Sequence, residues 1–110
     1  MPREKKQASK SGYAFPKPTL DELLASQRQA NRVTVEFLKV DVGIALTFSG
    51  IALTAANNAK KLRNVKAARR GYDTVVGFLP RTEMSESDAE DMRRNLRRLK
   101  SELRQLGEKF

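Results

Sequence analysis

The side chains with the clearest chemical potential are basic, and they gather in the run KKLRNVKAARR at residues 60–70. Cations at this density can neutralise the phosphates of nucleic acid or another anionic surface. The candidate anion-binding residues are Lys60, Lys61, Arg63, Lys66 and Arg70. The competing interpretation is a solvated helix face, which we favour because aromatic residues are too sparse for a platform that stacks bases.

Carboxylates gather further along the chain and could hold Mg²⁺ through oxygen ligands. They are Glu83, Glu86, Asp88, Glu90 and Asp91. Acidic side chains are also stabilised in the first turns of a helix by its dipole, and this interpretation explains the cluster better.

Histidine and cysteine are absent from all 110 residues. Their absence excludes a Ser-His-Asp hydrolase, the usual nitrogen and sulfur ligands of zinc, and any disulfide framework. We therefore expect a protein that is not an enzyme and needs no cofactor and no metal. A chain without cysteine is compatible with a reducing compartment, so we expect the cytoplasm.

The N-terminal segment, residues 1–17, is basic and contains Gly12 and Pro16, which break helices. It predicts a disordered tail, without the apolar stretch of a signal peptide. The remaining residues, 18–110, predict a single helical domain with a modest core.

Apolar spacing predicts an all-α fold, a bundle of three to four helices built on a central antiparallel hairpin. The helices are expected near 20–39, 41–56, 59–79 and 86–106. Thr19 and Glu22 have the spacing of a capping box at the first start, and Pro80 ends the third helix. The first two helices could also run on as one.

No charged residue lies between Val42 and Ala59, although the net charge is +9. A helix that is apolar on nearly all sides is either buried or spans a membrane. Because this one contains glycine, threonine and asparagine, we expect burial by the other helices and no membrane. One face has only small side chains, which predicts close helix contact, at Gly43, Thr47, Gly50 and Thr54. Replacing Gly50 by Leu should then destabilise the fold by several kcal/mol.

The last predicted helix has apolar residues at alternating steps of three and four, the spacing of a heptad seam. They are Ala89, Met92, Leu96, Leu99, Leu103 and Leu106. Ser85 can cap the start of this helix, and Gly107 suits the left-handed residue after its end. The seam must find a partner helix, either in this chain or in another.

A family resemblance concerns residues 46–80. Ala68, Tyr72 and Pro80 follow the spacing of the second half of a tetratricopeptide hairpin, and Leu46 and Gly50 fall in its first half. This segment resembles a single tetratricopeptide-like hairpin, and ARRGYDTVVGFLPR resembles stretches in small bacterial proteins of no assigned function. The resemblance implies an antiparallel hairpin that docks partner proteins.

Together these features predict a non-catalytic protein-interaction or structural module. Its expected partner is an unidentified protein or a second copy of the chain. The alternative function is binding of nucleic acid or another anionic surface through the basic tail and residues 60–70.

Overall fold

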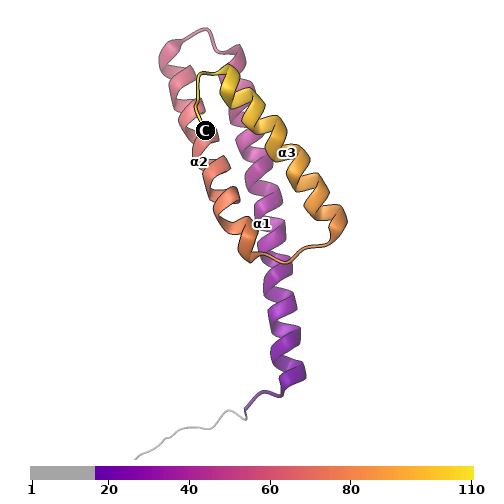
Figure 1. Cartoon of the computed structure of the whole chain (residues 1–110). Helices are drawn as coiled ribbons and strands as arrows, with labels where there is room; N and C mark the ends of the chain where they lie inside the picture. The colour runs from indigo at the N-terminus through magenta and orange to yellow at the C-terminus, as the bar shows by residue number, and fades with distance from the viewer. Residues whose placement is uncertain (1–16) are drawn as a thin grey trace, which may run out of the picture.

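The computed structural model describes residues 17–110 and contains three α-helices (Figure 1). They are α1 (Leu20–Thr54), α2 (Asn58–Phe78) and α3 (Glu86–Gln105), with a 3₁₀ turn, η1 (Leu79–Arg81), after α2. No strand occurs within residues 17–110, so the all-α prediction is confirmed. The predicted disordered tail lies outside the described residues, apart from Lys17.

A single helix, α1, replaces the first two predicted helices. It is 35 residues long, and the alternative of one uninterrupted helix is therefore right. Its start is the predicted capping box, in which Glu22 N–H donates to Thr19 Oγ1 at 3.1 Å and Thr19 N–H donates to Glu22 Oε1 at 2.7 Å. The segment around Lys39 contains neither proline nor glycine, so nothing there interrupts the helix.

The buried face of α1 lies elsewhere than the sequence predicted. Its residues step by three and four, and we call them the inner seam: Val35, Leu38, Val42, Ala45, Ser49 and Ala52. The expectation that the charge-free segment is surrounded by other helices is wrong, because Ile44 and Leu53 are exposed. Small side chains at Ala45, Ser49 and Ala52 let neighbouring helices approach closely, whereas several of the larger side chains point outward.

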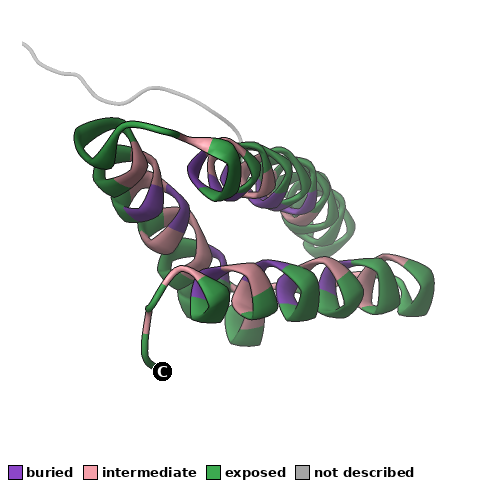
Figure 2. Ribbon diagram, turned by 90° about the horizontal axis from the view of Figure 1, so that it is seen from above, coloured by how far each residue is buried: buried purple, intermediate pink, exposed green. Residues whose placement is uncertain are grey.

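The second helix, α2, runs back beside the C-terminal part of α1, and α3 lies alongside both (Figure 1). The buried residues lie on the sides of the helices that face one another (Figure 2). The two helices approach closely at Gly71 of α2, where a Cβ atom would lie 2.8 Å from the Cβ of Ala45. Gly71 therefore sets the spacing between α1 and α2.

The seam predicted for the last helix is buried within this chain. Met92, Leu96, Leu99 and Leu103 are buried, and Ala89 and Leu106 are half-buried. The predicted end of this helix is also confirmed, because Gly107 has a φ of 98°. The N–H groups of Gly107 and Glu108 bond back to the carbonyls of Arg104 and Leu103, which closes a Schellman motif.

The N-terminal part of α1 extends beyond α2 and α3 (Figure 1). All residues from 20 to 30 are exposed, and we call this segment the extension. It carries Leu20, Leu23 and Leu24, whose side chains find no burial in the described chain.

Candidate interaction surface

Large apolar side chains line the outside of α1 in the structure. Val33, Phe37, Val40 and Ile44 are 46%, 64%, 55% and 48% exposed, and we call them the outer stripe. Three of them line a shallow hollow of about 440 Å³ with Gln29, Arg32 and Glu36. The packing of α2 and α3 on α1 therefore leaves this apolar stripe uncovered in the described chain.

The face of small residues does not contact another helix of the described chain. Gly43, Thr47, Gly50 and Thr54 are exposed, and a Cβ at either glycine would meet nothing within 4 Å. The two threonine hydroxyls donate to carbonyls of α1 itself, at 3.1 Å for Thr47 and 3.3 Å for Thr54. The prediction of helix contact here is therefore wrong within the fold, as is the expected large effect of Gly50→Leu.

Four of the five predicted anion-binding residues share the outward side of α2. Lys60, Arg63, Lys66 and Arg70 are exposed and follow one another at steps of three, three and four, and we call them the basic stripe. Lys61 is half-buried and lies on another side of the helix. Among residues 17–110, no carboxylate pairs with any of the four, so their charges are available to a ligand.

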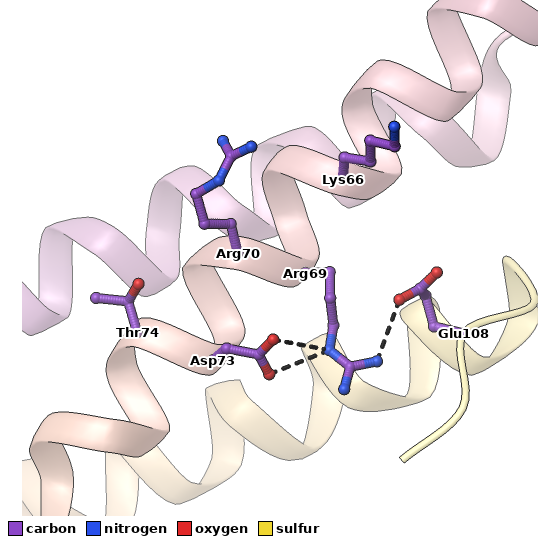
Figure 3. Close-up of a pocket in the computed structure, with 6 residues that line it drawn as sticks. All are labelled: Lys66, Arg69, Arg70, Asp73, Thr74 and Glu108. Carbon is purple, nitrogen blue, oxygen red and sulfur yellow. Dashed lines mark hydrogen bonds and ion pairs between the residues drawn. The ribbon is translucent and has the colours of Figure 1, made fainter.

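A fifth cation of the same run, Arg69, is held by ion pairs within the protein (Figure 3). Its Nε donates to both carboxylate oxygens of Asp73, at 3.1 and 3.2 Å, and its Nη1 donates to Glu108 Oε1 at 3.1 Å. Its guanidinium also lies 4.1 Å from the ring centre of Phe110. Lys66 and Arg70 point away from this group. The hollow of about 500 Å³ beside Arg69 is lined by cations and by the carboxylates of Asp73 and Glu108, so it carries both signs of charge.

The outer stripe and the basic stripe border the same groove. Ile44 and Phe48 of α1 and Arg70 and Thr74 of α2 line a hollow of about 320 Å³ between the two helices. A ligand with an apolar part and an anionic part could therefore touch both stripes.

Two polar contacts fix α3 on α1, and no sequence pattern predicted either of them. The hydroxyl of the buried Ser49 donates to Glu102, which also accepts from Arg98 Nε at 3.1 Å. Lys39 Nζ lies 3.0 Å from Asp88 Oδ1. That hydrogen bond lowers the pKa of the Asp88 carboxyl and raises the pKa of the Lys39 ammonium.

The acidic residues that could have held Mg²⁺ do not come together. In the described part of the chain no three carboxylates approach one another closely enough to share a metal ion. Asp88 faces Lys39, Asp91 faces Arg94 at 2.9 Å, and Glu86 lies 3.8 Å from Arg93. Their partners are cations of the protein.

By length and composition, α1 could cross a lipid bilayer, a property that it shares with core helices and signal sequences. In the most apolar 18-residue segment of α1, 28% of the residues are buried in this structure. Because the charged helices α2 and α3 pack along that segment, α1 would have to separate from both helices in order to span a membrane.

No family model, curated protein or solved structure matches this chain. The tetratricopeptide resemblance therefore stays a prediction.

Proposed function

We propose that this protein is a non-catalytic helical module that binds another protein chain through α1. The observation that carries the proposal is the exposure of the outer stripe and of the leucines of the extension on one continuous helix. Full burial of such a side chain contributes roughly 1.5–3 kcal/mol, so a partner that covers several of them has a sufficient driving force.

The shape of α1 supports this proposal as well. Helices that dock on other proteins present apolar anchors at steps of three and four along one face, as Val33, Phe37, Val40 and Ile44 do. The three-helix packing around the inner seam gives α1 a rigid base, which lowers the entropic cost of ordering the helix when it binds.

Photo-cross-linking in the cells that make the protein tests this proposal directly. A photoreactive phenylalanine analogue at position 37 should give defined protein adducts, and mass spectrometry identifies the chain attached. The matched control is position 25, because Ala25 is also exposed on α1 but lies off the outer stripe. Equal adducts at both positions, or none at position 37, would contradict a docking role for the stripe.

The second candidate function is binding of an anionic polymer, which the basic stripe favours. Four cations that release counterions from duplex DNA give a slope of about −3.6 in log affinity against log salt. Replacing Lys66 and Arg70 by Glu should abolish binding at low salt, whereas Arg69→Gln should not. No binding of a short DNA duplex at low salt would remove this candidate.

A further inference from the structure

We infer that the partner of α1 is α1 of a second copy of this chain, paired antiparallel. This inference rests on the proposed function, because it names the occupant of the same surface. The starting observation is a second heptad spacing along α1, made of ten residues at strictly alternating steps of three and four. We call them the outer seam: Leu23, Ser26, Ala30, Val33, Phe37, Val40, Ile44, Thr47, Ile51 and Thr54.

The outer seam is free in the described chain. Nine of its ten residues are exposed and Ile51 is half-buried. At 3.6 residues per turn it lies roughly 140° around α1 from the inner seam, which α2 and α3 cover. A second helix can therefore approach the outer seam without displacing either of them.

One antiparallel register gives every residue of the outer seam a partner. With the twofold axis between residues 37 and 40, Phe37 packs against Val40 of the second copy, and Val33 packs against its Ile44. Two of the outer layers place a large side chain opposite a small one, Leu23 with Thr54 and Ser26 with Ile51, and the third pairs two small ones, Ala30 with Thr47. Large and small residues that alternate across facing positions are what a closely packed helix pair requires.

Charge selects the antiparallel orientation over the parallel one. In a parallel pair, Glu36 of each chain would lie beside Asp41 of the other, at the flanking positions where like charges repel. In the antiparallel register, Glu36 lies beside Gly43 of the second copy and Asp41 lies beside its Thr34. The exposed glycines Gly43 and Gly50, each about 1 kcal/mol less favourable than Ala in a helix, then leave room beside the seam.

The area of the contact is compatible with a dimer that associates weakly. Residues 23–54 form a strip about 48 Å long and about 10 Å wide, which amounts to about 480 Å² on each chain. The pair therefore buries on the order of 1,000 Å², close to the lower bound for a specific interface. In this arrangement the extension of each copy lies along residues 47–54 of the other, so its exposed leucine at position 23 is covered.

Disulfide trapping of the full chain tests the pairing. The chain has no native cysteine, so any disulfide must join the introduced cysteines. Val33→Cys and Ile44→Cys are prepared separately, mixed, equilibrated and oxidised. The antiparallel register predicts a disulfide-linked dimer in the mixture, with neither variant forming one when alone. A dimer from Val33→Cys by itself indicates a parallel pair and overturns the inference, as does the absence of a dimer in the mixture. Ala25→Cys, off the seam, is the control for random collision.

Sedimentation across a range of concentrations gives an independent readout. The wild-type chain should show a reversible monomer–dimer equilibrium, and Val40→Glu should weaken association by at least about tenfold. Circular dichroism establishes whether that variant is folded, and Phe37→Ser serves as a second, milder variant. A wild-type chain that is monomeric throughout overturns self-pairing.

The proposed function and this inference fail in different ways. Adducts at position 37 to a different protein, with a monomeric wild type, overturn self-pairing and leave the docking role of α1 intact. Flotation of the chain with phosphatidylglycerol vesicles that is lost in Phe37→Ser would assign the stripe to lipid and overturn both.

Discussion

At Gly71 the helix α2 lies so close to Ala45 of α1 that no side chain can be added without a shift of the backbone. Gly71→Ala should destabilise the protein by about 1–3 kcal/mol, because the new methyl group would overlap Ala45. Gly50→Ala, whose methyl group meets nothing within 4 Å among residues 17–110, should be neutral or stabilise the protein by up to about 1 kcal/mol. Urea unfolding of the two variants measures the difference, and the opposite order would show that the α1–α2 contact is misplaced.

The ion pair between Lys39 and Asp88 makes stability depend on pH. The pKa of the Asp88 carboxyl is lower in the folded than in the unfolded chain, so its contribution is complete above the unfolded value of about 4. The contribution is lost as the pH falls through the folded value. Thermal melts of wild type and Asp88→Asn should therefore differ at pH 6, and the difference should shrink as the pH falls through the folded value.

At the alkaline end the sign is reversed. The raised pKa of Lys39 means that its contribution is present below its ordinary value and is lost only as the pH rises through the folded value. If the difference in melting temperature between wild type and Asp88→Asn grew as the pH fell towards 3, the stabilising role of the Lys39–Asp88 ion pair would be contradicted. Glu90→Gln, which changes an exposed carboxylate that pairs with no cation among residues 17–110, is the matched control.

At the scale of the helices, the signals that sequence analysis used correctly were local ones. Ser85 and Gly107 mark the ends of α3 within one residue, because a cap and a left-handed residue act on their own neighbours. The heptad seam of α3 was also identified correctly, since its remaining residues are charged or polar and leave only one apolar face.

The buried face of α1 could not be predicted in the same way. Apolar residues cover several sides of this helix, so periodicity alone does not select the one that is buried. The structure uses Ala45, Ser49 and Ala52, whose small size allows close packing, and Ser49 is buried because Glu102 accepts its hydrogen bond. Both facts depend on residues far away in the sequence, as does the docking of Phe110 on Arg69.

The end of α3 makes a prediction at this scale. Gly107→Ala forces a side chain into a left-handed conformation and should cost about 1–2 kcal/mol. Because the turn at Gly107 directs Glu108 and Phe110 to Arg69, the variant should also expose Tyr72, which lies 5.0 Å from the Phe110 ring between centres. Tyrosine fluorescence quenching reports that exposure. Gly77→Ala, whose methyl group would meet no described atom within 4 Å, should not lower the stability and should leave the quenching of Tyr72 unchanged.

For the whole molecule, the structure separates a three-helix part from the extension. Gln27→Pro should remove helix from the extension and leave the cooperative melting transition in place, because residues 20–30 are all exposed in the described part of the chain. Circular dichroism at concentrations where the chain is monomeric measures both effects. Val42→Pro, in the inner seam, should abolish the transition, and a similar loss from Gln27→Pro would show that the extension belongs to the core.

The continuity of α1 has a mechanical consequence. A helix without proline or glycine between residues 20 and 42 has no joint, so its free end cannot swing relative to the part that α2 and α3 grip. The eleven residues of the extension reach about 16 Å beyond that grip, at a fixed angle. A chain bound to this end would therefore be kept at a set distance from the three-helix part.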